Sequence, residues 1–404
     1  MVSFDNTEYA FAYKSDKELK QARFLFSLMG KQWLVNMGLK LAPFAIRNKI
    51  PFTDSIIRNT IFQQFVGGET MENTAPVVNR LEKYGVKVIL DYGVEGGTGE
   101  RAFDEACAEF TRVIQYASGQ PNIPFMSIKL TGLVRFGLLE QLDKLMHEHN
   151  AGLSQRLEYA ESKLNDQERA EWEKAKHRMY QICKAAFEGN VGVMVDAEES
   201  WIQEPVDAVT MNMMAQFNRE KGCVYNTIQL YRHDRLAFLK ESLEYAEEGN
   251  YILAAKLVRG AYMEKERERA LTMNYPSPIQ PDKTSTDRDY NDAVKFCFEH
   301  LDKIAVIIAS HNEKSNLLGV ELLQGSGLKA DHERVHFSQL YGMSDNITFN
   351  LARHGCSVSK YLPFGPIKDV VPYLMRRAQE NTSVAGQTGR ELGLISRELK
   401  RRGQ

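Results

Sequence analysis

The sequence predicts an α/β fold in which eight strands alternate with helices and close into a barrel. Eight short runs rich in apolar and β-branched residues recur between residues 86 and 361. Each run ends in polar residues and is followed by a stretch whose apolar residues have helical spacing. Strands that are apolar along their length are typical of a parallel sheet covered by helices, and eight of them are most simply arranged as a barrel.

The bounds of the strands follow from these runs. We expect strands at residues 86–92, 125–130, 191–196, 224–230, 252–258, 304–309, 335–339 and 356–361. A doubly wound open sheet is the alternative, because it also alternates parallel strands with helices. The chain has 404 residues, which exceeds the usual size of a single core but is within the range of barrels with insertions.

Helical segments precede, interrupt and follow the barrel. Residues 1–85 form a predicted helical lead-in, in which Ser15 and Glu18 have the spacing of a capping box. The barrel itself spans residues 86–383, with a charged helical insertion at about 138–188 between the second and third strands. Residues 384–404 form a basic C-terminal tail, read either as a solvated helix or as a contact with an anionic membrane surface.

Composition and charge argue against a nucleic-acid-binding, a disulfide-rich or a membrane-spanning protein. The formal net charge is −2, so no overall field favours nucleic acid as a partner. The five cysteines are far apart and form no CxxC pair, which indicates reduced thiols. The N-terminus lacks the features of a secretory signal, and no apolar run is long enough to span a membrane. We expect a cytoplasmic protein, with peripheral contact to the inner face of the cytoplasmic membrane as an open alternative. Without an HExxH motif or a compact Cys/His set, no metal site is predicted.

Polar residues close the predicted strands. In a β/α barrel the carboxyl ends of the strands meet at one face, where the active site lies. In chain order, the polar residues at these ends include Asp91, Lys129, Asp196, Gln229, Lys256, His311, Asn312, Gln339 and Tyr361. One strand-end charge is often an ordinary surface residue, but this succession indicates a site. Because an unpaired ammonium in an apolar run is costly, Lys129 and Lys256 are each expected to face an anion or a bound ligand.

Two adjacent arginines, Arg376 and Arg377, follow the eighth strand on a predicted helix. Arginine offers a planar fork of donors for a carboxylate and stays charged at any working pH. The alternative is an exposed basic pair neutralised by Glu380. A Schiff-base lyase that uses Lys129 or Lys256 as its nucleophile, or a non-catalytic barrel, is also left open.

Several motifs resemble the proline dehydrogenase family. They are KLVRGAY at the fifth strand, SHN at the sixth and Y-x14-RR-x2-EN after the eighth, together with SIKLTGL, VDAEES, QLY and FSQLYGM. The likeness covers most of the chain. Among the members of the family, the chain resembles the longer, eukaryotic-type monofunctional ones. It implies a distorted (β/α)8 barrel that binds FAD and oxidises L-proline to Δ1-pyrroline-5-carboxylate, the first step of proline catabolism to glutamate. It also implies that the electrons pass to a membrane quinone.

The resemblance further implies roles for individual residues. Lys129, Arg376 and Arg377 would hold the proline carboxylate, and Tyr262 and Tyr361 would pack around its ring. The residues expected at the flavin, with Asp196 bordering the substrate as well, are Asp196, Gln229, Lys256, Gly260, Ala261, His311, Asn312, Gln339, Arg377, Glu380 and Ser383. Lys256 departs from the arginine that several members carry. Hydroxyproline is the alternative substrate, because it differs from proline by one hydroxyl group.

Overall fold

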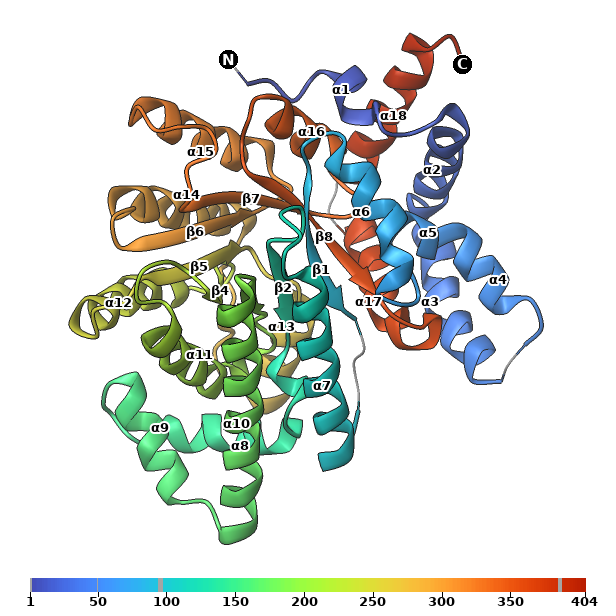
Figure 1. Ribbon diagram of the computed structural model, residues 1–404. Helices are drawn as coiled ribbons and strands as arrows, with labels where there is room; N and C mark the ends of the chain where they lie inside the picture. The colour runs from blue at the N-terminus through green and yellow to red at the C-terminus, as the bar shows by residue number, and fades with distance from the viewer. Residues whose placement is uncertain (1, 49, 94–96, 384–386) are drawn as a thin grey trace. The chain divides into compact units, whose positions relative to one another are not determined.

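The computed structural model describes residues 2–48, 50–93, 97–383 and 387–404 (Figure 1). Its eight strands follow one another in chain order around a closed parallel barrel. They are β1 (Lys87–Tyr92), β2 (Phe125–Ile128), β3 (Gly192–Val195), β4 (Val224–Gln229), β5 (Leu253–Val258), β6 (Ile304–Ala309), β7 (Val335–Leu340) and β8 (Val358–Phe364). The prediction of an eight-stranded barrel is confirmed, and the open-sheet alternative is wrong.

The chain divides into two compact units. The first consists of Met1–Glu95 and Phe337–Gln404, and the second of Gly96–His336. The first unit contains β1, β8 and most of β7, and β8 pairs in parallel with both β1 and β7. The second unit contains β2 to β6, each paired in parallel with the next.

Some strand bounds differ from those expected. β2 and β3 have only four residues each, so Lys129 and Asp196 lie just after these strands and not within them. β8 continues three residues beyond its predicted end at residue 361 and includes Pro363. Tyr361 therefore lies in the middle of β8. The carbonyl of Pro363 still accepts a hydrogen bond from the N–H of Gly67 at 2.8 Å, so the strand remains anchored there.

Helices α1 to α6 and α16 to α18 belong to the first unit. Their bounds are α1 (Thr7–Phe11), α2 (Asp16–Met29), α3 (Gln32–Arg47), α4 (Thr53–Ile57), α5 (Gln63–Phe65), α6 (Ala75–Glu82), α16 (Asp345–Arg353), α17 (Ile367–Ser383) and α18 (Gln387–Arg401). The predicted capping box is present at the start of α2. The Glu18 N–H donates to Ser15 Oγ at 3.3 Å, and the Ser15 N–H donates to the Glu18 carboxylate at 2.8 Å.

One apolar core joins the helical lead-in to the end of the chain. It includes buried residues from α2, α17 and α18, among them Leu19, Phe26, Val370, Leu374 and Ile395. Helix α18 is therefore not a solvated tail, because its apolar side is part of this core. Arg402, directly after the helix, pairs with Glu398 at 2.7 Å and with Asp16 at 2.9 Å.

Helices α7 to α15 belong to the second unit. Their bounds are α7 (Glu100–Ala117), α8 (Phe136–Met146), α9 (Leu153–Ser162), α10 (Asp166–Gly189), α11 (Gln203–Phe217), α12 (Arg235–Glu248), α13 (Met263–Met273), α14 (Lys283–Glu299) and α15 (Glu313–Gly325). The long connection between β2 and β3 consists of α8, α9 and α10, so the predicted helical insertion is confirmed. Helix α10 lies along α7 (Figure 1), and Cys107 of α7 contacts Arg178 and Gln181 of α10.

Candidate active site

A carboxylate lies between two lysines at the strand ends of the second unit. Asp196 directly follows β3, and its backbone N–H donates to the carbonyl of Ile128 at the end of β2 at 2.8 Å. Asp196 Oδ1 forms an ion pair with Lys256 Nζ, and its Oδ2 lies 3.6 Å from Lys129 Nζ. The expectation that each lysine faces an anion is confirmed, with Asp196 as the anion.

The environment of this cluster strengthens its electrostatic effect. The exposed fraction of the side chain is 6% for Lys256, 14% for Asp196 and 18% for Lys129. Charges that are shielded from water interact more strongly and are less screened by salt. Two ammonium groups and one carboxylate carry a net charge of +1, so the cluster favours an anionic ligand or a ligand that gains negative charge.

A buried amide at the end of β4 has unused hydrogen-bonding capacity. Gln229 is only 2% exposed, and its Nε2 donates to the carbonyl of Glu198 at 3.1 Å. Its Oε1 has no hydrogen-bond partner within the described part of the chain. A buried acceptor without a donor costs about 1–3 kcal/mol. A ligand with an N–H group at this position would remove that cost.

The segment after β5 requires glycine at residue 260. Gly260 has φ of 138°, which side-chain-bearing residues rarely adopt, and a Cβ there would lie 2.4 Å from the ring of Tyr231. The neighbouring Ala261 is exposed, and the half-buried Tyr262 is the N-cap of helix α13. The backbone of this turn is therefore held against the Tyr231 ring.

Arg259 holds this turn in place, a role that the sequence analysis did not assign. Its guanidinium donates to Asp287 Oδ1 at 2.8 Å, to Ser310 Oγ at 2.8 Å and to Ser315 Oγ at 3.0 Å. It also stacks on Tyr290, with its Cζ 4.3 Å from the ring centroid. The signal in the sequence was its position directly after the fifth strand.

His311 and Asn312 follow β6, as predicted. Asn312 is the N-cap of α15, and its side chain accepts a hydrogen bond from the Ser315 N–H at 3.2 Å. This contact gives Asn312 a local structural role in addition to the expected one at the flavin. His311 is half-buried beside it.

The remaining predicted residues lie in the first unit. Gln339, in β7, is buried and accepts a hydrogen bond from Thr348 Oγ1 at 2.7 Å. Tyr361 is half-buried in β8, and Arg376 is half-buried in α17. Arg377 is buried, with its Cζ 5.0 Å from the ring centroid of Tyr373, so the alternative of an exposed basic pair is wrong. The backbones of Glu380 and Ser383 belong to α17, but their side chains lie outside the described part of the structure.

A second charged cluster, in the first unit, was missed by the sequence analysis. Lys360 is fully buried, and its Nζ lies 2.9 Å from Asp345 Oδ1; the Tyr13 hydroxyl donates to Asp345 Oδ2 at 2.8 Å. Burial alone would raise the pKa of Asp345, but the charges of Lys360 and Lys14 hold it at about 2. Successive residues of a strand point to opposite faces of the sheet, so Lys360 and Tyr361 have different surroundings. We therefore assign the Lys360–Asp345 cluster to the stability of the fold.

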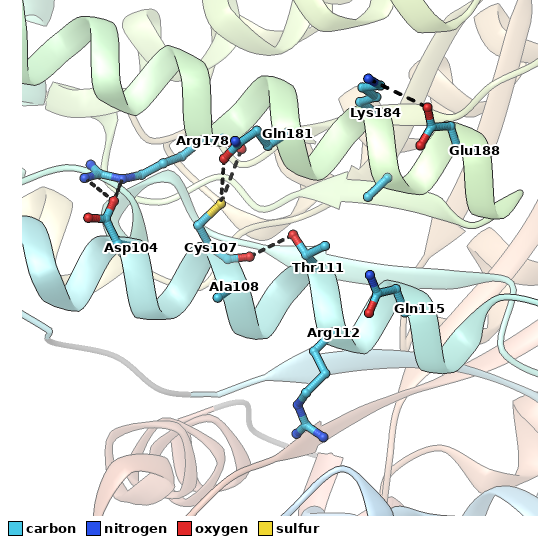
Figure 2. A pocket seen from close by; sticks show the side chains of 11 residues that line it. Asp104, Cys107, Ala108, Thr111, Arg112, Gln115, Arg178, Gln181, Lys184 and Glu188 are labelled. Atoms are coloured by element: carbon cyan, nitrogen blue, oxygen red, sulfur yellow. Dashed lines mark hydrogen bonds and ion pairs between the residues drawn. The ribbon is translucent and has the colours of Figure 1, made fainter.

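A surface groove between α7 and α10 contains none of the predicted site residues. Figure 2 shows that polar side chains line it and that several of them bind one another. Arg178 donates to Asp104 at 2.8 Å, and Lys184 lies 3.9 Å from Glu188. Since these groups satisfy one another, the groove is explained by the packing of the two helices.

Comparison with known proteins agrees with the resemblance seen in the motifs. The family model described as proline dehydrogenase matches residues 75–390. The chain is 32% identical over 374 residues to proline dehydrogenase 1, mitochondrial, of Dictyostelium discoideum, covering 86% of this chain and 65% of that protein. It is 33% identical over 363 residues to the carbapenem antibiotics biosynthesis protein CarD of Pectobacterium carotovorum, covering 90% of each chain. It is 32% identical over 365 residues to hydroxyproline dehydrogenase of Xenopus laevis, covering 86% of this chain and 78% of that protein.

The solved structures support the fold. Proline utilization A of Bdellovibrio bacteriovorus, inactivated by N-propargylglycine, matches with a TM-score of 0.72 at 18% sequence identity. The match covers 94% of this chain and 43% of that one. The chain thus spans about two thirds of the Dictyostelium protein and less than half of this bacterial one. The family model covers most of the sequence and the barrel is the expected one, so the chain belongs to the proline dehydrogenase family.

Proposed function

We propose that this protein oxidises L-proline to Δ1-pyrroline-5-carboxylate with FAD as its cofactor and a membrane quinone as the final electron acceptor. The observation that carries the proposal is the cluster of Lys129, Asp196 and Lys256 at the strand ends of a barrel that belongs to this family. The cluster combines a net positive charge with burial, which suits a substrate carboxylate and a flavin that becomes more negative on reduction.

The residues of the second unit fit a flavin. Gln229 offers a buried acceptor without a donor, which a ring N–H would satisfy. Lys256 provides a buried cation, and Gly260 provides a stretch of backbone without a side chain. When bound, FAD would supply the hydride acceptor. Lys256 would then stabilise the negative charge of the reduced ring, while Asp196 holds Lys256 in position.

The substrate would be held chiefly through its carboxylate. Lys129 contributes one cation, and Arg376 and Arg377 contribute planar donors that suit bidentate binding. Tyr262 and Tyr361 would limit the movement of the ring. Loss of a hydride from the carbon beside the nitrogen requires the neutral amine and close, fixed orientation, so no side chain has to act as a nucleophile.

Two alternative functions are a Schiff-base lyase and a hydroxyproline dehydrogenase. A Schiff-base lyase needs one of the two lysines as a free amine. Lys129 and Lys256 both lie against Asp196, and an ion pair uses the ammonium form, which cannot attack a carbonyl group. Hydroxyproline is a closer alternative, favoured by the similarity to the Xenopus hydroxyproline dehydrogenase.

To reduce a quinone that is dissolved in a membrane, the protein must contact the membrane surface. No helix within the described residues is both long enough and apolar enough to cross a bilayer. We therefore propose peripheral contact with the inner face of the cytoplasmic membrane, where a quinone could be reached.

The first test is a visible absorption spectrum of the purified protein supplied with FAD, recorded before and after anaerobic addition of L-proline. We expect the flavin band to bleach with L-proline and more slowly with trans-4-hydroxy-L-proline. If only hydroxyproline bleached the flavin band, hydroxyproline would replace proline as the proposed substrate. A protein that retains no FAD would refute the proposal.

A further inference from the structure

A cluster of exposed apolar side chains lies on α3 and in the segment that follows it to the end of α4. Seven of the seventeen large apolar side chains that are exposed in the described chain fall within residues 33–56. Their exposed fractions run from 44% to 81%, and the residues are Trp33, Met37, Leu41, Phe44, Ile50, Phe52 and Ile56. We call this set the α3–α4 face. Monomeric proteins rarely leave such a group of side chains in water without a use.

The other side of α3 already has a partner. Val35 is buried in the core of the first unit, and Leu39 and Ile46 are partly buried against it. The four exposed residues on α3 itself recur at intervals of three and four, so they form one face of the helix. Helix α3 is thus anchored through one side and presents a second apolar side outward. Packing within the first unit cannot explain that second side.

The charge of this region identifies the kind of surface it would meet. Residues 20–62 contain seven Lys or Arg residues and a single acidic residue, Asp54, a formal charge of +6 in a chain of net charge −2. Arg23, Lys31 and Lys40 are exposed. Aromatic and apolar side chains flanked by basic ones are characteristic of helices that lie at the surface of an anionic bilayer.

A second copy of the chain fits this face less well. A symmetric dimer would place the same patch of both copies together, so two regions of like charge would meet. Like charges across an interface oppose association. The phosphate groups of anionic lipids instead complement the basic residues, and the acyl chains accept the apolar ones.

We propose that the α3–α4 face docks this protein on an anionic phospholipid surface, with Trp33, Phe44 and Phe52 inserted at the level of the lipid head groups. The inference deepens the proposed function, on which its purpose rests, because it gives the chain a way to reach a quinone in the bilayer. It also reassigns the membrane contact that the sequence suggested for the basic C-terminal tail. Leu394, Ile395 and Leu399 of α18 are buried, and Arg401 and Arg402 pair with Glu398.

Vesicle binding tests the proposal without substrate, flavin reduction or quinone. The intact protein would be sedimented with phosphatidylcholine vesicles that contain or lack phosphatidylglycerol. We expect binding to the anionic vesicles, weakened by salt, and a loss of about tenfold or more in the Phe44→Glu/Phe52→Glu variant. The matched control is Leu271→Glu/Met273→Glu, which alters two exposed apolar residues on α13 and should bind as the unaltered protein does.

Tryptophan fluorescence reports the orientation on the membrane. Among the three tryptophans only Trp33 is on the α3–α4 face; Trp172 is buried, and Trp201 is covered by Arg269 with Cζ 4.3 Å from its ring. Lipids with brominated acyl chains should quench Trp33, and Trp33→Phe should abolish the quenching while sedimentation persists.

Three results would overturn the inference. These are absence of binding to anionic vesicles, equal binding by the Phe44→Glu/Phe52→Glu variant, and self-association that this variant abolishes in the absence of lipid. The last result would assign the face to a second copy. Circular dichroism would establish that the variants are folded. Because bleaching of the flavin by proline is measured separately in solution, failure of the membrane inference and failure of the proposed function can be distinguished.

Discussion

Removing the charge of Asp196 gives the sharpest test of the site, because two lysines depend on it. Asp196→Asn keeps the size of the side chain but leaves Lys256, whose side chain is 6% exposed, without its carboxylate partner. Breaking a buried pair by removing one partner typically costs about 3–5 kcal/mol. The more exposed contact with Lys129, at 3.6 Å, adds only about 0–1 kcal/mol. We expect Asp196→Asn to lower the free energy of unfolding by about 3 kcal/mol.

A double-mutant cycle separates this pair from general damage to the barrel. Lys256→Met alone should cost less, since Asp196 keeps Lys129 as a partner. In the variant that carries both changes the buried ammonium that had faced Asp196 is absent as well, so part of the stability should return. A coupling free energy of about 2 kcal/mol is expected.

Urea unfolding of the flavin-free proteins, followed by fluorescence, measures these free energies. If Asp196→Asn unfolds at the same urea concentration as the unaltered protein, or if the two single changes are simply additive, the pair does not have the stabilising role assigned to it. The flavin provides a second readout. Loss of the Lys256 cation should make the reduction potential more negative, and an unchanged potential in Lys256→Met would exclude its proposed electrostatic role.

Three further predictions concern other parts of the molecule. Arg376→Met or Arg377→Met should each reduce kcat/KM for proline about a hundredfold, an effect of about 3 kcal/mol, and near-unaltered kinetics in both would remove the carboxylate clamp. Gly260→Ala should weaken flavin retention, measured by FAD titration, because the new Cβ would lie 2.4 Å from the Tyr231 ring; undiminished affinity would contradict the need for glycine. Burial raises the pKa of Asp143 from 3.8 to about 7, so the fold favours its neutral form and loses that stabilisation as pH rises from about 4 to 7. The stability of the unaltered protein relative to Asp143→Asn should therefore fall over this range in denaturation experiments, and a constant difference would refute the assignment.

The barrel could be predicted because its strands are buried on both sides. Such strands appear in the sequence as continuous apolar runs, and all eight were found near their observed positions. Their ends were harder to place, because a strand ends where pairing ends. β8 illustrates the difficulty: its apolar run was expected to end at residue 361, yet the strand continues through Pro363 to Phe364 beside β1.

The site was predictable in its residue types but not in its contacts. The sequence indicated that Lys256 needs an anion, but Asp196 is 60 positions away, and only the pairing of β3, β4 and β5 brings the two together. The contact between Gly260 and Tyr231 has the same origin. Lys360 was overlooked because a buried lysine inside a strand carries no sign of its partner, and Asp345 lies on a separate helix.

The membrane contact shows why a count of basic residues is a poor guide to an interface. Helix α18 has the more conspicuous basic sequence, but Arg401 and the following Arg402 pair with Glu398, and Leu394, Ile395 and Leu399 of the helix are buried. Helix α3 has fewer charges and exposes Trp33 and Phe44 to water. Binding to a bilayer depends on apolar area that is still unburied after folding, together with charges that remain available to lipid. Both conditions depend on packing, so the α3–α4 face could be identified only after the internal partners of each helix were known.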